Sequence, residues 1–152
     1  MSEDGPVPQP AWESIVEHSP ILSVDLVVRH GGGVVLGKRT NEPAEGEWFV
    51  PGGSVRKHER LDEAVHRIAD AELGVEVTVE RRLGVYEHFY DVADVAGADG
   101  KHYVPVAYEV TTDSETFEGD DQHADVGVFA PPFPFELHPY VRAYLVDAGV
   151  IE

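Results

Sequence analysis

The stretch PGGSVRKHERLDEAVHRIADAELGV, from Pro51 to Val75, most constrains the fold of this chain, because it joins a glycine pair to an amphipathic pattern. Apolar residues recur there at helical spacing, which predicts a helix from about Leu61 to Leu73. At about 100° per residue, the apolar stripe that carries Val65 and Ile68 also carries Glu72 near its middle. An ionised carboxylate on a buried face costs several kcal/mol unless a cation pairs with it. Glu72 therefore needs a partner.

The glycine pair Gly52-Gly53 precedes this helix in the sequence. Glycines let a backbone approach a ligand closely, and the free backbone groups at a helix N-terminus can meet that ligand. By itself the pair is typical of a turn between a strand and a helix. Glu72 favours a binding site, with Arg67 on an adjoining flank or a bound metal as its cation. The alternative is that Glu72 opens to solvent near the helix end.

Charge and composition exclude several classes of function. The chain has 29 Asp and Glu against 11 Lys and Arg, a net charge of −18, so binding of nucleic acid through a basic surface is not expected. The acidic residues are spread along the sequence, which is typical of proteins that work at very high salt. The absence of cysteine excludes disulfides, thiolate zinc sites and a cysteine nucleophile.

No apolar run approaches the length of a membrane span, and the acidic, Pro-rich start is unlike a signal peptide. We therefore expect a cytoplasmic protein with no membrane partner. The 152 residues contain no repeat and no long linker. We expect an N-terminal segment over 1–18, partly disordered or a short helix, followed by a single domain over 19–152.

Strand-like segments surround the central helix. The runs 21–30 and 32–40 flank Gly31-Gly32-Gly33, which predicts a β-hairpin. Further strands are expected within 48–53, 75–90, 101–113 and 126–130, with a polar, turn-like segment at 115–125. Helical spacing recurs in 11–20 and in 138–150. This mixture predicts an α+β fold, an α/β/α sandwich with a mixed β-sheet packed between helices.

The spacing of the central stretch resembles the signature of the Nudix hydrolases, G-x5-E-x7-R-E-U-x-E-E-x-G-U, in which U is aliphatic. The matching positions are Gly53, Glu59, Arg67, Glu72, Gly74 and Val75. Ile68 and Ala71 stand where the signature has two more glutamates. In the wider family those carboxylates help to hold several divalent cations and to supply or orient the base, so their absence disfavours multi-metal pyrophosphate cleavage.

From about Pro20 to Phe129 the chain is similar to the GDP-mannose mannosyl hydrolases, a Nudix subgroup that cleaves the glycosidic bond. The segments GKRTNEPAEGEWFVPGG, AELG and QH carry this resemblance. It implies one Mg²⁺ per subunit, with Mn²⁺ as a substitute, held by the Gly52 carbonyl, the Glu72 carboxylate and the Gln122 side-chain oxygen. All three donors are oxygens, which suits either metal. The resemblance also implies a homodimer.

The same resemblance implies roles for further residues. His123 would be the general base that activates water, and Arg39 would stabilise the departing diphosphate. Asp25, His88 and Tyr103 would lie near the sugar and the leaving group and hold them by hydrogen bonds, with Asp25 and Tyr103 also binding the substrate. Arg67 would orient Glu72 or bind a phosphate, and Glu59 would pair with Arg67 or hold the loop. Taken singly, each of these side chains also suits a structural or surface role.

The expected activity is Mg²⁺-dependent release of GDP and a free hexose from GDP-mannose or GDP-glucose, by attack of water at C1 of the sugar. The alternatives are a pyrophosphohydrolase acting on ADP-ribose or a nucleoside triphosphate, and a non-catalytic domain that binds nucleotide sugars. Ser54 stands where the subgroup has an arginine. Weaker stabilisation of the leaving group is expected unless Arg56 or Lys57 replaces that charge.

Overall fold

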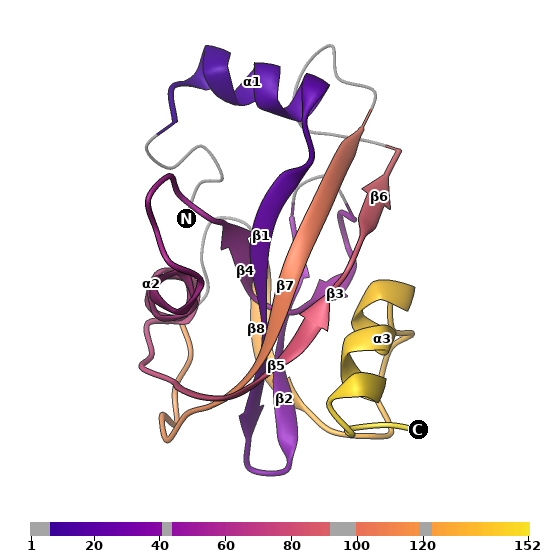
Figure 1. The fold of residues 1–152 in the computed structure, drawn as a ribbon. Helices are drawn as coiled ribbons and strands as arrows, with labels where there is room; N and C mark the ends of the chain where they lie inside the picture. The colour runs from indigo at the N-terminus through magenta and orange to yellow at the C-terminus, as the bar shows by residue number, and fades with distance from the viewer. Residues whose placement is uncertain (1–6, 41–43, 92–99, 119–122) are drawn as a thin grey trace.

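The computed structural model describes residues 7–40, 44–91, 100–118 and 123–152, with only the backbone at 123 and 124. Within them, one eight-stranded sheet lies between α2 (Leu61–Leu73) and α3 (Pro139–Asp147), and α1 (Gln9–His18) crosses one end of the sheet (Figure 1). The strands are β1 (Ile21–His30), β2 (Gly33–Arg39), β3 (Trp48–Phe49), β4 (Gly52–Ser54), β5 (Thr78–Val85), β6 (His88–Tyr90), β7 (Lys101–Thr111) and β8 (His123–Phe129). This confirms the predicted α+β fold with a mixed sheet between helices.

The parallel pair of β1 and β7 forms the centre of the sheet. The main path runs β3-β2-β1-β7-β5, while β4 pairs with β1, β6 with β7 and β8 with β2. The β1–β7 register is continuous from Ile21 opposite Tyr103 to Arg29 opposite Thr111, and the other pairings are antiparallel. The sheet is therefore mixed, and its central strands are covered on both faces.

The predicted hairpin is confirmed. Arg29 lies opposite Val34 and His30 opposite Gly33, so that only Gly31 and Gly32 form the turn. Both glycines have positive φ, 54° and 84° respectively, which is the conformation that two-residue hairpin turns require.

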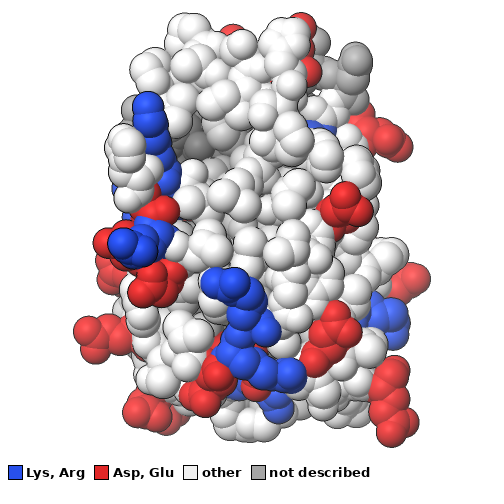
Figure 2. All heavy atoms as spheres, viewed as in Figure 1, with Lys and Arg blue, Asp and Glu red and all other residues white. Residues whose placement is uncertain are grey.

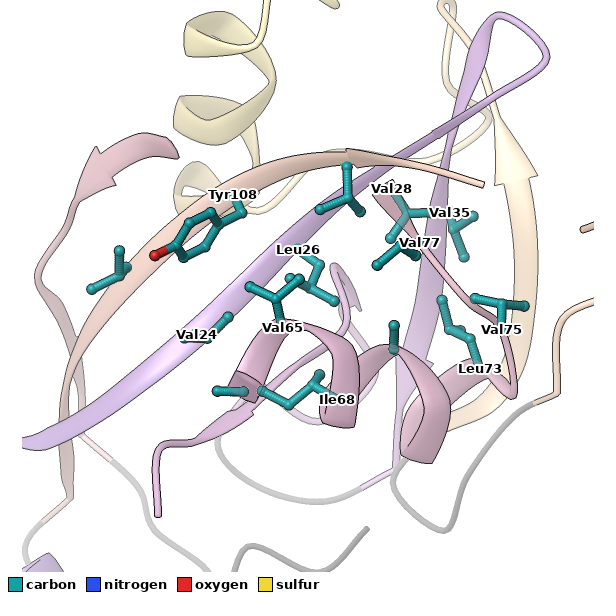
Figure 3. Packing of buried hydrophobic residues seen from close by; sticks show 14 residues of the cluster. Val24, Leu26, Val28, Val35, Val65, Ile68, Leu73, Val75, Val77 and Tyr108 are labelled. Atoms are coloured by element: carbon teal, nitrogen blue, oxygen red, sulfur yellow. The ribbon is translucent and has the colours of Figure 1, made fainter. Parts of the chain in front are cut away.

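The helix predicted from the amphipathic pattern is also confirmed, with both ends as expected. Glu63 accepts a hydrogen bond of 2.7 Å from the Arg60 backbone N–H at the N-terminus. The helix ends at Gly74, which has a left-handed φ of 67°. In Figure 3, Val65 points from α2 toward the strands, and Ile68 belongs to the same buried cluster. Glu72 is 4% exposed, so this carboxylate is buried on the same helix.

The glycine pair and the polar segment before β8 differ from the prediction. Gly52 and Gly53 lie in β4, extended beside β1, and the chain turns into α2 only over 55–60. The segment 115–125 was expected to be turn-like, yet β8 begins at His123, because the strand pairs there with Arg39 of β2. The predictions of a glycine turn and of a loop through 125 were therefore wrong.

Two further features concern the surface. α1 packs through Trp12 and Val16 against Ile21 and Tyr103 at the end of the sheet. Acidic side chains are dispersed around the rim of the face in Figure 2, and basic ones lie beside some of them, so no single charged patch forms there. Among the helices that the structure describes, none is both long and apolar enough to span a bilayer.

Candidate active site

Asp25 lies at the point where β1 meets β4. It is opposite Gly52 in the strand register, and a Cβ built on Gly52 would collide with the Asp25 Oδ1 atom. Only glycine leaves room for this carboxylate. The other carboxylate oxygen, Oδ2, accepts a hydrogen bond of 2.5 Å from the Tyr144 hydroxyl of α3. Asp25 is thus held between β4 on one side and α3 on the other.

Asp25 lies in β1 and Gly52 in β4, and α2, the helix that carries Glu72, packs against both strands. A side chain at Gly52 would fill the space that the Asp25 carboxylate occupies. Glycine has no side-chain ligand atom, so its backbone carbonyl oxygen is the donor that this residue can offer to a metal. The described part of the chain contains no group of three or more His, Cys, Asp or Glu side chains that converge as metal ligands. A metal held here would depend on one buried carboxylate together with neutral oxygen donors, which is the donor set that suits Mg²⁺.

Gln122, the third expected ligand, lies outside the described residues. The chain on either side of it is anchored. The Glu118 N–H donates a hydrogen bond of 2.9 Å to the carbonyl of Leu73, the residue after Glu72. On the other side, His123 pairs with Arg39. Both anchors therefore adjoin residues that the sequence placed in the site.

Arg39 and His123 are brought together by the pairing of β2 with β8. Their Cα atoms are partners in the register, next to an irregularity between Gly37 and Arg39. Arg39 also receives a backbone hydrogen bond of 2.9 Å from Gly46, which fixes the start of the following loop. The structure describes only the backbone of His123, so its assignment as the general base stays a prediction.

His88 is buried on the face of the sheet covered by α3. Its ring is 3% exposed and stacks on the Tyr140 ring, with centroids 4.0 Å apart and planes 5° apart. Burial, reinforced by the nearby His138, lowers the pKa of His88 to about 4. At neutral pH the imidazole is therefore uncharged, and it can offer one donor and one acceptor but no positive charge.

Tyr103 is paired with His88 across β6 and β7, so these two predicted residues are neighbours. The Tyr103 hydroxyl accepts a hydrogen bond of 3.3 Å from the Lys101 ammonium, which is itself 2% exposed. The Lys101 Nζ atom also lies 5.5 Å from the centre of the Trp12 ring. α1 thus covers a buried cation next to Tyr103.

Arg67 and Glu59 form a bidentate ion pair at the N-terminal side of α2. The Arg67 Nε and Nη2 atoms donate to Glu59 at 2.7 and 3.0 Å, and Nη2 also donates to the Ser54 carbonyl at 2.8 Å. The guanidinium lowers the pKa of Glu59, aided by a hydrogen bond from the Arg56 backbone. This pair ties the helix to the end of β4, two residues from Gly52.

Sequence reasoning missed the two tyrosines of α3. Tyr140 stacks on His88, and Tyr144 bonds to Asp25. Burial, followed by the charge of Asp25, raises the pKa of the Tyr144 hydroxyl far above its usual value, so the hydroxyl remains a donor. The available signal was the spacing of four residues between them in a helical segment, which places both on one face.

A sequence model of the NUDIX domain matches residues 20–139, and the chain belongs to the NUDIX family. Among solved structures, a MutT NUDIX hydrolase from Burkholderia pseudomallei has the same fold with a TM-score of 0.67. That match has 26% identity and covers 89% of this chain and 100% of the other. The fold and the signature thus define the class as a Nudix hydrolase.

Two relatives show how far the similarity extends. The low-salt glycan biosynthesis protein Agl8 from Haloferax volcanii is 58% identical over 139 residues, which is 91% of this chain and 88% of that protein. An ADP-ribose pyrophosphatase from Methanocaldococcus jannaschii is 37% identical over 67 residues, 44% of this chain and 40% of its own length. The first similarity runs along nearly the whole chain, whereas the second covers less than half.

Proposed function

We propose that this protein is a Mg²⁺-dependent Nudix hydrolase that releases GDP and a free hexose from GDP-mannose or GDP-glucose. The observation that carries the proposal is the reduced set of carboxylates on α2. Glu72 is buried at 4% exposure, whereas the position of one missing signature glutamate is Ile68, which is 1% exposed in the aliphatic core. An apolar side chain there leaves room for fewer metal ligands than pyrophosphate cleavage by several metals uses.

One metal ion suffices when its task is to neutralise a leaving diphosphate. Mg²⁺ takes about six oxygen ligands and usually keeps phosphate and water oxygens among them. The Gly52 carbonyl, the Glu72 carboxylate and the Gln122 amide oxygen would hold it. The remaining positions would be left for the substrate.

The reaction is a displacement at the sugar. His123 would take a proton from water as the water oxygen forms a bond to C1, and the bond between C1 and the diphosphate oxygen would break, with the electron pair leaving on GDP. Arg39, opposite His123 in the strand register, would bind the departing diphosphate. The Asp25 carboxylate, the neutral His88 ring and the Tyr103 hydroxyl would hold the sugar and the diphosphate.

Ser54 is the position where the charge for the leaving group is reduced relative to the subgroup. Its hydroxyl is buried without a hydrogen-bond partner among the described residues. Of the two neighbouring cations, Arg56 is half-buried and Lys57 is exposed. Arg56 is therefore the better candidate to supply the charge.

The similarity to Agl8, which is named as a glycan biosynthesis protein, supports a substrate that carries a sugar. That relative comes from Haloferax volcanii, and the net charge of −18 of this chain suits a solution of high salt, so we propose a halophilic protein. The family resemblance further supports a homodimer. The shorter match to an ADP-ribose pyrophosphatase favours a second candidate, hydrolysis of the pyrophosphate of a nucleoside diphosphate derivative.

Product analysis separates these candidates. The protein is incubated with GDP-mannose and Mg²⁺ at molar salt in ¹⁸O-water. The proposal expects GDP and mannose, with the label in the sugar. GMP and mannose 1-phosphate would overturn it in favour of pyrophosphate cleavage, and tight nucleotide binding without turnover in any divalent metal would indicate a non-catalytic binding domain.

The substitution His123→Gln tests the base. A positioned general base contributes on the order of 10²–10⁴ in rate, so kcat should fall by that factor while Mn²⁺ binding, followed by electron paramagnetic resonance, is unchanged. His66→Gln is the matched control, because His66 is exposed on α2. Wild-type kcat in the His123 variant would remove the assignment.

A further inference from the structure

The helix α3 contributes none of the functional residues expected from the sequence, yet it contacts two of them. This helix presents Tyr140 and Tyr144, one turn apart, to the strands beneath it. Tyr140 stacks on His88, and Tyr144 donates its hydroxyl proton to Asp25. Two residues proposed to hold the substrate are therefore both contacted by a single helix.

The Tyr144 ring has no freedom to move away from Asp25. It is fully buried, with 0% exposure. The Tyr86 ring meets it edge-on, with centroids 4.7 Å apart and planes 88° apart, and the His88 ring lies 5.5 Å from it. The hydroxyl position is therefore determined by packing on several sides.

The Asp25 carboxylate is correspondingly constrained at both oxygens. Tyr144 holds Oδ2 at 2.5 Å, while Oδ1 lies against Gly52, where a Cβ would collide with it. Loss of the tyrosine contact would remove one of the constraints on the orientation of this carboxylate. The rate of a displacement reaction at carbon depends steeply on the orientation of the groups around that carbon.

We propose that Tyr144 is a positioning residue, which holds the Asp25 carboxylate against Gly52 in the orientation that the substrate requires. The proposal rests on the proposed function for the role of Asp25 toward substrate. The hydroxyl acts through Asp25 alone, and the ring acts as packing. Tyr144→Phe removes the first and keeps the second.

The chain offers a matched control in Tyr86. Its hydroxyl also donates a hydrogen bond of 2.5 Å to a carboxylate, that of Asp147, but at the exposed end of α3. Both rings belong to the same aromatic cluster. Tyr86→Phe therefore deletes the same kind of bond but keeps the ring that packs on Tyr144 and the contact with Asp25, and we expect its kcat to stay within twofold of wild type.

In Tyr144→Phe, kcat for GDP-mannose should fall at least tenfold while KM changes less than twofold, measured with the full chain at molar salt. The decisive measurement is a double-mutant cycle with Asp25→Ala, which removes the acceptor. Because Tyr144 acts through Asp25, Tyr144→Phe should cost less than twofold in the Asp25→Ala background. A loss of the same factor in both backgrounds, or wild-type kcat in Tyr144→Phe, would overturn the proposal.

A second cycle needs no turnover. The urea midpoint of the same four proteins should fall on Tyr144→Phe in the wild-type background and change much less in the Asp25→Ala background. Equal shifts in both backgrounds would overturn the proposal independently of the kinetics. Release of GMP by the wild-type protein would instead refute the proposed reaction, and the midpoint cycle would still decide whether Tyr144 holds Asp25.

Discussion

The two faces of the sheet differ in the kinds of side chain that pack on them. The face toward α2 is a mainly aliphatic layer that includes one buried tyrosine, and Val24, Leu26 and Val28 of β1 belong to it (Figure 3). The face toward α3, here called the aromatic face, mixes aliphatic residues with aromatic rings that form hydrogen bonds, and Tyr144 is among its fully buried side chains. The same strand supplies both, because its even-numbered residues face α2 while Asp25 and Val27 face α3.

This difference indicates which face of the sheet can hold functional groups in fixed orientations. Close-packed aliphatic contacts give stability but no directional interactions. Aromatic rings with polar tips pack and also hold hydrogen-bonding groups in fixed orientations. Glu72 is the exception on the α2 side, a carboxylate that the aliphatic layer does not explain. We therefore expect perturbations of the two faces to separate stability from acid sensitivity.

The largest effect is expected on the aliphatic face. Ile68→Ala removes a side chain that is 1% exposed, and the lost burial with the remaining cavity should lower the free energy of unfolding by about 3 kcal/mol. The folded fraction should keep the kcat of the wild type. Urea unfolding followed by tryptophan fluorescence measures the first, and initial rates measure the second. A large drop in kcat at full folding would mean that the two faces are not separable.

A smaller effect, with a defined pH window, is expected on the aromatic face. The pKa of His88 is about 4 in the folded protein against an ordinary value of 6.5, so the unfolded chain binds the proton more tightly. Stability is then complete above 6.5 and is lost as the pH falls toward 4. Between pH 7 and pH 5 the loss should be about 2 kcal/mol, and it should disappear in His88→Gln. An identical pH dependence in both proteins would contradict this.

The smallest effect is expected at the polar edge of α2. The pKa of Glu59 is lowered, chiefly by the hydrogen bonds from Arg67, so its stabilisation is complete above 4.5 and is lost as the pH falls further. Glu59→Gln should cost about 1 kcal/mol at neutral pH, with the difference closing in acid. Urea titrations from neutral pH to pH 3 measure this. Acid loss on this edge should thus begin below pH 4.5, near the lower end of the pH window of the aromatic face.

The sequence predicted the local elements well. The helix from Leu61 to Leu73 and the hairpin at Gly31-Gly32 follow from periodicity and turn chemistry over short ranges. The burial of Glu72 followed from its place in the apolar stripe. Each of these depends on residues close together in the chain, and short-range rules are sufficient for them.

The contacts around Asp25 could not be predicted in this way. Tyr144 is 119 positions away in the sequence, and the collision that keeps Gly52 a glycine appears only when β4 lies beside β1. The start of β8 at His123 likewise depends on a partner strand, because the polar residues around it have little strand preference of their own. Tertiary pairing decides such positions, and a single sequence holds no direct record of it.

The parallel register between β1 and β7 has a consequence for how the chain acquires this structure. The paired residues are about 80 positions apart, whereas the β1–β2 hairpin closes over two. Closing so distant a contact is slow compared with forming a hairpin. During synthesis the hairpin emerges and forms early, but its strand β1 stays without its main neighbour until β7 has left the ribosome. The half-made protein therefore exposes the valine-rich edge that later becomes the centre of the sheet, and the interval before β7 arrives is when the chain is most open to aggregation.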